Sequence, residues 1–202
     1  YIDMVEINTS FYRPPTPRQA QGWLKQVENR PGFTFSVKVW QRFTHERGPV
    51  EPLEVRDFAD GIRPIADAGR LAALVCQFPW SFRKTEDNML HIERLHRAFE
   101  RFPLAVEIRH AAWNDPEFIN FLKEHDIAFV NVDQPPVRDT LRPTVHVTAD
   151  FSYVRLHGRN TRDWFREDAT RDRRYNYLYS PDEIREWLDR IRQLEEARRG
   201  PQ

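Results

Sequence analysis

The 202-residue chain has one cysteine, Cys76, so no disulfide can form within it. Near-absence of cysteine suits a reducing compartment, and we therefore expect a cytoplasmic protein. The sequence also has no secretory signal peptide and no apolar run that is long enough to span a bilayer. We therefore expect no membrane partner. Cys76 lies within an apolar run, where inert core packing is the simplest interpretation.

An excess of positive charge is missing too. Lysine and arginine total 31 residues, aspartate and glutamate also total 31, and the formal net charge is zero. A generally basic surface for duplex nucleic acid is therefore not expected, although a local basic patch stays open.

Motifs for cofactors are absent as well. The sequence has no glycine-rich phosphate loop, no dinucleotide-binding fingerprint and no HExxH zinc motif. We therefore predict no cofactor and no metal. A divalent ion held by carboxylates and a histidine at the strand ends is the alternative, but neighbouring lysine and arginine side chains oppose it.

What the sequence does contain is six apolar, β-branched runs of strand length. They alternate with helical patterns, which predicts an α/β fold with parallel strands and right-handed crossovers. No linker or repeat interrupts the pattern, so we expect one domain. The six runs are MVEIN from Met4, FTFSVKV from Phe33, LAALVCQF from Leu71, LAVEIRH from Leu104, IAFVNVD from Ile127 and FSYVRLH from Phe151.

Helix start signals lie between most of these runs and after the last one. Thr16 with Gln19, and Ser180 with Glu183, form two capping boxes, and Asp115 before a proline predicts a third start. Asp87 is expected to begin another helix, with a buried stripe of Leu90, Leu95 and Phe99.

Two connections depart from the regular alternation. The stretch 134–150 has too many prolines for a helix and is interpreted as an extended connection. The loop 158–180 is long for an α/β unit and rich in arginine. It is a lid, an anion-binding arm or a solvated surface, and the sequence leaves all three open.

Polar residues gather at the carboxyl ends of the predicted strands, the end at which α/β folds carry their active sites. Alternate residues of a strand face the same side, so these residues form pairs. We predict a pocket there, because burying so many charged groups is costly unless they have a role. A purely structural ion-pair network is the alternative. The pairs are Glu6 with Asn8, Ser36 with Lys38, Glu107 with Arg109, Asn131 with Asp133, and Arg155 with His157, and Gln77 ends the third run.

Four of these residues are candidates for catalysis. Glu6 or Glu107 suits a general base, and a locked salt bridge is the equal alternative. Lys38 suits a Schiff-base nucleophile if nearby cations lower its pKa. His157 suits a proton shuttle or a structural hydrogen bond.

The candidate substrate-binding residues are of two kinds. Arginine forks suit carboxylate or phosphate groups, and aromatic rings suit a sugar or a base. Packing within loops is the alternative for the aromatic rings. The predicted binding set is Asn8, Tyr12, Gln77, Arg109, Trp113 and Arg155.

Several motifs, in order along nearly the whole chain, resemble the YecE-like family. They are VEINTSFYRPP, FSVKVWQRFTH, LVCQFPWSF, AVEIRHAAW, YVRLHGR and YLYSPDEIREW. The resemblance implies a TIM-barrel-like fold and no assigned function. The positions that match the family's motifs are Glu6, Asn8, Phe11, Tyr12, Lys38, Thr44, His45, Gln77, Glu107, Arg109, Trp113, Arg155, His157 and Gly158.

The chain departs from that family at both ends. The family's first strand, with a glycine- and tryptophan-rich turn, and its final strand are missing from the sequence. We therefore expect a single partial barrel over residues 1–202, either a fragment or a natural truncation. Exposed strand edges would then favour self-association.

The function expected from these observations is that of an enzyme or a binding protein for a small anionic or polyhydroxylated ligand. The ligand would lie at the carboxyl ends of the strands. Two alternatives are a barrel that binds or processes nucleic acid and a non-catalytic interaction scaffold.

Overall fold

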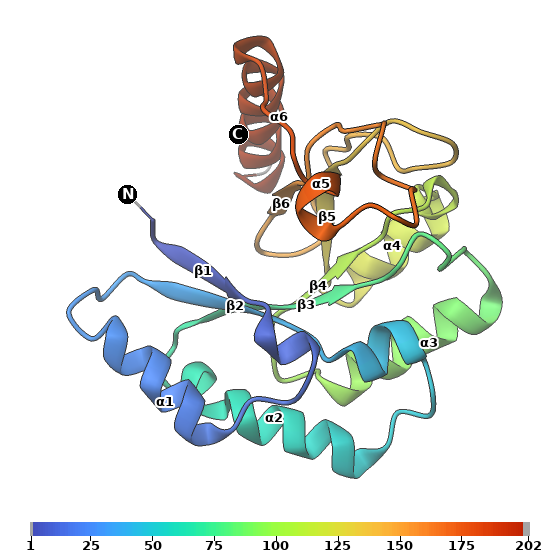
Figure 1. Cartoon of the computed structure of the whole chain (residues 1–202). Coiled ribbons are helices and arrows are strands. Elements are labelled where there is room, and N and C mark those ends of the chain that lie inside the picture. Colours follow the sequence, from blue (N-terminus) through green and yellow to red (C-terminus); the bar gives the residue numbers. More distant parts are fainter. Residues whose placement is uncertain (1, 200–202) are drawn as a thin grey trace. The chain divides into compact units, whose positions relative to one another are not determined.

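A computed structural model describes residues 2–199 of the chain (Figure 1). All six predicted strands are confirmed, each within about two residues except the fourth, which is shorter than its run. The strands are β1 (Met4–Ile7), β2 (Thr34–Lys38), β3 (Leu71–Gln77), β4 (Leu104–Glu107), β5 (Ala128–Asp133) and β6 (Tyr153–Leu156). The helices are α1 (Pro17–Gln26), α2 (Pro52–Asp67), α3 (Glu86–Ala98), α4 (Pro116–Glu124), α5 (Arg171–Arg174) and α6 (Pro181–Arg199). Short 3-10 turns η1 (Thr9–Phe11) and η3 (Ala111–Trp113) and a π-helical turn η2 (Arg42–Glu46) follow three of the strands.

The strands follow one another in the sheet in sequence order, from β1 to β6. Pairing is parallel between β1 and β2, between β2 and β3, and between β5 and β6. In the last pair Val132 lies opposite Arg155. Parallel strands joined by helices in this order form the TIM-barrel-like α/β fold that the sequence predicts.

The chain divides into two compact units. The first comprises residues 1–79 and 85–106, and the second comprises residues 80–84 and 107–202. The single domain expected from the sequence stays a prediction, and each unit is described by itself.

In the first unit, α1 and α2 pack against each other on one side of β1 and β2 (Figure 1). Helix α2 also approaches the segment just before α1 closely at Gly61, where an added Cβ atom would overlap the carbonyl oxygen of Pro15. Beside α2, the rings of Phe43, Phe58 and Phe99 meet edge to face, with centroids 5.7 to 6.5 Å apart. Buried aromatic rings arranged in this way supply much of the apolar surface that stabilises the unit.

Helix starts follow the sequence signals with one correction. Thr16 and Gln19 form the predicted capping box, Asp115 accepts two backbone N–H groups, and Ser180 with Glu183 forms the second box. The cap of α3 is Thr85, whose hydroxyl accepts the Asn88 N–H at 3.3 Å, and not Asp87. The threonine lies in extended backbone before the first helical turn, where a capping side chain must lie.

The predicted stripe of α3 is correct in part. Leu95 and Phe99 are buried, whereas Leu90 is 40% exposed, because His91 and Ile92 take the inward positions of that turn. His91 Nε2 lies 2.6 Å from the Phe43 carbonyl oxygen and donates to it, because a carbonyl only accepts.

Cys76 is buried in β3. Burial raises the pKa of its thiol to about 12, so the thiolate does not form at neutral pH. The residue is therefore confirmed as unreactive core.

In the second unit, the stretch 134–150 forms no helix and no β-strand apart from an isolated bridge at Thr140, as predicted. Asn131 of β5 holds this connection: its Oδ1 accepts the Thr144 hydroxyl at 2.8 Å and the His146 N–H at 2.9 Å. The loop after β6 contains the short helix α5, which the sequence did not indicate. No helix within residues 2–199 is both long and apolar enough to cross a membrane.

Candidate functional site

Glu107, the last residue of β4, is the centre of a buried cluster of charged side chains in the second unit. Its side chain is fully buried, and its Oε1 accepts from Arg109 Nε at 3.1 Å and from His157 Nε2 at 3.0 Å. Oε2 accepts from Arg155 Nη1. Arg155 belongs to β6 and His157 follows that strand directly, so the carboxyl ends of β4 and β6 supply all four groups. The sequence predicted each of them.

These partners decide the protonation states of the cluster. Burial by itself would raise the pKa of Glu107, but His157, Arg109 and Arg155 together hold it well below its ordinary value. Burial, opposed by Glu107, lowers the pKa of His157. At neutral pH the carboxylate is therefore ionised and the imidazole is neutral. A carboxylate only accepts, so Nε2 carries the imidazole proton and Nδ1 is left as an acceptor.

Aromatic rings cover the cluster. The guanidinium of Arg109 lies 5.3 Å from the centre of the Trp164 ring, and its side chain is 11% exposed. His157 lies 5.9 Å from Tyr175 and 6.4 Å from Trp164, measured between ring centres. Both rings belong to the loop 158–180. Sequence reasoning missed Trp164, for which the only signal was a tryptophan within a charged run.

The predicted site residues of the first unit lie at the ends of its strands. Lys38 ends β2, and its Nζ lies 3.9 Å from the centre of the Phe11 ring. Asn8 Nδ2 donates to the Glu6 carbonyl at 3.4 Å. The Lys38 carbonyl accepts the Ser10 hydroxyl at 2.6 Å, which fixes the turn after β1 against β2.

Tyr12 and Gln77 complete the predicted set in that unit. The Tyr12 side chain is 63% exposed, and its carbonyl accepts the indole N–H of Trp40 at 3.2 Å. Gln77 is the last residue of β3. A pocket shared by these residues and Glu107 stays a prediction.

The side chain of Trp113 packs among other buried side chains. It is fully buried and stacks on Phe82 with ring centres 5.2 Å apart. Its indole N–H donates to the Phe82 carbonyl at 2.7 Å. The ring therefore belongs to the core of the second unit in this structure, which is the alternative that the sequence left open for loop aromatics.

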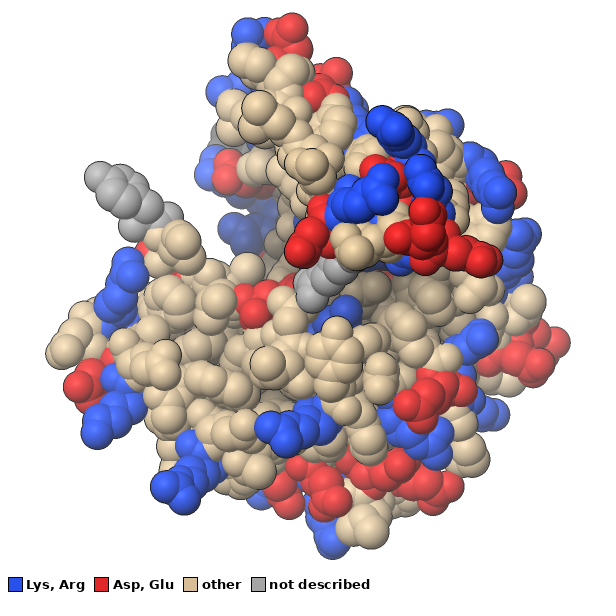
Figure 2. Space-filling model, viewed as in Figure 1, with Lys and Arg blue, Asp and Glu red and all other residues tan. Residues whose placement is uncertain are grey.

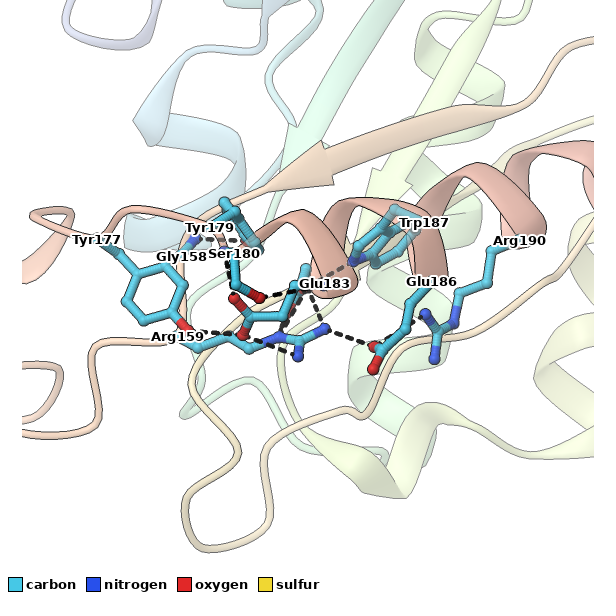
Figure 3. A network of polar contacts seen from close by, with 10 residues as sticks. Gly158, Arg159, Tyr177, Tyr179, Ser180, Glu183, Glu186, Trp187 and Arg190 are labelled. Carbon is cyan, nitrogen blue, oxygen red and sulfur yellow. Dashed lines mark hydrogen bonds and ion pairs between the residues drawn. The ribbon is translucent and has the colours of Figure 1, made fainter.

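Asp133, at the end of β5, belongs to a separate network of polar contacts, most of which Figure 3 shows, and sequence reasoning did not predict that these residues come together. Its carboxylate accepts from Arg159 Nε at 3.0 Å through both oxygens, and also from Trp187 Nε1. Arg159 donates as well to Glu183 at 3.1 Å and to Glu186 at 3.2 Å. These bonds attach the first turns of α6 to the ends of β5 and β6.

The same network perturbs two other groups. Hydrogen bonding to Asp133 is the main cause of the raised pKa of Arg159. Burial, together with the charge of Asp133, raises the pKa of Tyr179 to about 12, and its hydroxyl accepts the Gly158 N–H at 2.9 Å. Gly158 has a φ of +81°, and a Cβ atom there would crowd Tyr177, so a glycine suits this turn. The polar groups of this network hold one another, which indicates a structural role.

The amino-acid sequence of the chain matches that of a known protein family over almost its whole length. A family model described as "Protein of unknown function DUF72" matches residues 1–201. The chain belongs to the DUF72 family. The resemblance to the YecE-like family that the motifs indicated agrees in part with this result. Both families lack an assigned function, but the matching family is named DUF72.

Relatives of this DUF72 chain have been described in several bacteria. The UPF0759 protein YunF of Bacillus subtilis (strain 168) is 28% identical over 211 residues, covering 97% of this chain and 74% of that protein. The crystal structure of a DUF72 family protein from Thermotoga maritima MSB8 is 33% identical, with a TM-score of 0.85 over 97% of this chain and 74% of its own. A second, from Enterococcus faecalis V583, is 26% identical, with a TM-score of 0.86 over 96% of this chain and 74% of its own.

No group of three or more metal-binding side chains occurs among the residues described in this DUF72 chain. A metal ion is not favoured at Glu107, because two guanidinium groups and an imidazole N–H already donate to its carboxylate. Such donors fit an anion next to them rather than a cation.

Proposed function

We propose that this DUF72 chain binds a small anionic or polyhydroxylated ligand at the carboxyl ends of β4 and β6, with Arg109 as the main anion-binding group. One observation carries the proposal: among the described residues, the Arg109 guanidinium bonds only to Glu107, through a hydrogen bond from Nε and an ion pair from Nη2, both at 3.1 Å. Nη1 bonds to none of the described residues and is left for a ligand, in a side chain that is 11% exposed and lies 5.3 Å from the centre of the Trp164 ring. A planar guanidinium fixed in this way is preorganised for a carboxylate or phosphate group.

His157 supplies a chemical step for such a ligand. Glu107 accepts its Nε2–H, which orients the ring and leaves the neutral Nδ1 to take a proton from a ligand hydroxyl. Glu107 itself is a weak base, because three donors already use its oxygens. In this proposal Glu107 positions His157, and His157 is the base. General-base or Schiff-base roles for Glu6 and Lys38 stay predictions.

Other parts of the prediction have weaker support. Lysine and arginine are interspersed with acidic residues over the face seen in Figure 2, which does not favour a nucleic-acid surface. We further propose that the family is the one called YecE-like and that the protein is cytoplasmic. The location is supported by the single, buried cysteine.

The test is a thermal-shift screen of small anions, such as phosphate, citrate and sugar phosphates, followed by calorimetry on any ligand that raises the melting temperature. We expect Arg109→Gln to weaken binding of that ligand about tenfold or more, because a charge-assisted hydrogen bond is lost. Arg190→Gln is the matched control, since Arg190 lies 5.3 Å from the Trp187 ring in the same type of contact.

Two results would contradict the proposal. In the first, Arg109→Gln and Arg190→Gln bind the ligand equally well, so that the ligand lies elsewhere. In the second, Arg109→Gln leaves the protein unfolded at room temperature, which would indicate that the cluster around Glu107 is a structural network.

A further inference from the structure

Two buried N–H groups of the second unit have no acceptor within the described part of the chain. His110 is 5% exposed, and its ring centre lies 5.4 Å from that of Trp80. Its Nδ1 accepts the Ala112 N–H at 3.1 Å, so the proton of the neutral ring must be on Nε2. Both His110 Nε2 and Trp80 Nε1 are buried without a partner among residues 2–199. A buried donor left unpaired costs roughly 1 to 3 kcal/mol, so an acceptor from outside the chain is expected.

Cationic and aromatic groups surround these donors. The Arg83 guanidinium lies 5.0 Å from the Trp80 ring, and Arg138 lies 5.3 Å from the Phe165 ring. Phe165 meets Trp80 edge to face at 5.4 Å. Arg83 lies directly against Trp80, whereas Arg138 lies against the neighbouring Phe165 ring, and their positive charges favour an acceptor that carries negative charge.

An acidic side chain, Asp139, reduces the positive potential of the arginines near His110. Burial and the charge of Arg83 lower the pKa of His110, while the nearby Asp139 raises it less. Asp139 is exposed, whereas the imidazole is buried. The ring therefore acts as a neutral donor at neutral pH, and the positive charge comes from the arginines.

The turn that carries Arg138 is held in an uncommon conformation. Arg138 has a φ of +47°, in the left-handed region that non-glycine residues rarely adopt. The Thr140 hydroxyl stabilises the turn by donating to the Pro135 carbonyl at 2.9 Å and accepting the Val137 N–H at 3.2 Å. Conformations of this kind concentrate at binding sites, where the surrounding structure maintains them.

We propose that Trp80 Nε1–H and His110 Nε2–H together bind an oxyanion, the phosphate or carboxylate group of a small ligand, which Arg83 and Arg138 attract. This site is additional to the one at Arg109. His110 directly follows Arg109 and has extended backbone angles (φ −93°, ψ 135°), so the two side chains leave the backbone on opposite sides. Trp164 covers Arg109 and Phe165 covers Trp80, so the loop 158–180 contributes one ring to each site.

Nuclear magnetic resonance of the uniformly 15N-labelled chain tests the proposal. The six tryptophans give six indole N–H signals, and the Trp80 signal is assigned by its loss in Trp80→Phe. Inorganic phosphate and acetate are titrated in separate arms, with sodium chloride at matched ionic strength as a control. We expect the Trp80 signal to shift saturably with at least one oxyanion. Trp113 and Trp187 serve as internal controls, because their N–H groups already donate to Phe82 and Asp133.

Variants separate this site from the neighbouring one. Arg138→Gln should weaken the titrated affinity by about threefold, the effect of one nearby charge, while the exposed Arg142→Gln on the same connection should not. Trp80→Phe should weaken the affinity for the oxyanion about tenfold. Because this variant lacks the Trp80 signal, binding is followed through the ring signals of His110. Arg109→Gln should leave the titration unchanged.

Three results would overturn the proposal. A Trp80 signal that does not move with either oxyanion would mean that water satisfies the donors. An equal shift in sodium chloride would mean general screening. Loss of the titration in an Arg109→Gln protein that is still folded, as its Trp113 and Trp187 indole signals would show, would mean that the second site does not exist, whatever the outcome for the site at Arg109.

Discussion

At the scale of single residues, Glu107 shows what a buried charge requires. It is fully buried, and an ionised carboxylate is tolerated there only because Arg109, Arg155 and His157 donate to it. The alternation of side chains along a strand was enough to predict these four residues. It was not enough to predict the role of Trp164 or the buried N–H groups of Trp80 and His110, because these depend on loops whose course depends on the whole fold.

Replacing Glu107 with glutamine should destabilise the protein by about 3 kcal/mol or more, since the buried guanidinium groups then lose their shared carboxylate. Urea unfolding followed by fluorescence measures the change. Glu93→Gln is the control: Glu93 pairs with Arg97, whose side chain is 73% exposed, and we expect a change within about 0.5 kcal/mol. Equal effects of the two substitutions would show that the cluster at Glu107 has no special stabilising role.

His157 predicts a dependence of stability on pH. Its pKa in the folded protein lies below the ordinary 6.5, so the unfolded chain binds the proton more readily. Stability should therefore fall as the pH drops below 6.5, and level off for this group below the folded pKa. His157→Gln keeps an N–H donor for Glu107 but does not titrate. Its unfolding free energy should fall less steeply between roughly pH 7 and 5.5 than that of the unchanged chain, by up to about 1.4 kcal/mol per pH unit.

Other histidines do not confuse this comparison. His91, His110 and His146 also have lowered pKa values, but they are present in both proteins and cancel in the difference. Parallel stability curves for the two proteins would show that His157 titrates normally in the fold.

At the scale of helices and strands, local signals predicted most of the structure. Six apolar runs became six strands, and three capping signals placed helix starts correctly, because both depend on neighbours in sequence. The first residue of α3 was misplaced because Asp87 and Thr85 are both acceptable caps in sequence. Helix α5 escaped prediction, since a single turn within a long loop has no periodic pattern to reveal it.

Two glycines in neighbouring helices should respond oppositely to alanine. Gly22 of α1 has open space where a Cβ atom would lie, so Gly22→Ala should stabilise the protein by about 0.5 to 1 kcal/mol. Gly61→Ala should instead destabilise it, because the new methyl group overlaps the Pro15 carbonyl and must push α2 away from the segment that leads into α1. Thermal or urea unfolding of both variants checks this. Stabilisation by Gly61→Ala would show that the close approach of α2 to this segment is not needed.

At the scale of the whole molecule, an apolar stripe on α6 is exposed. Ile184, Leu188 and Ile191 have helical spacing and are 38 to 47% exposed, and Leu178 before the helix is 93% exposed. Exposed apolar side chains that lie together on one helix favour association. The interaction-scaffold alternative draws its support from this stripe.

We therefore expect the chain to self-associate as its concentration rises, and the double variant Ile184→Lys with Leu188→Lys to reduce that association. Sedimentation velocity at several concentrations measures both. Leu90→Lys on α3 is the control, since Leu90 is a 40% exposed leucine on another helix. A monomer at all concentrations, or equal effects of the control, would contradict the expectation.

A crystal structure of the chain with an anion from the thermal-shift screen tests the central proposal most directly. The proposal predicts that the acidic group of the ligand lies within hydrogen-bond distance of the Arg109 guanidinium while Arg109 keeps its bonds to Glu107. It is contradicted if the ligand binds away from Arg109 and the guanidinium makes no hydrogen bond other than the one to Glu107.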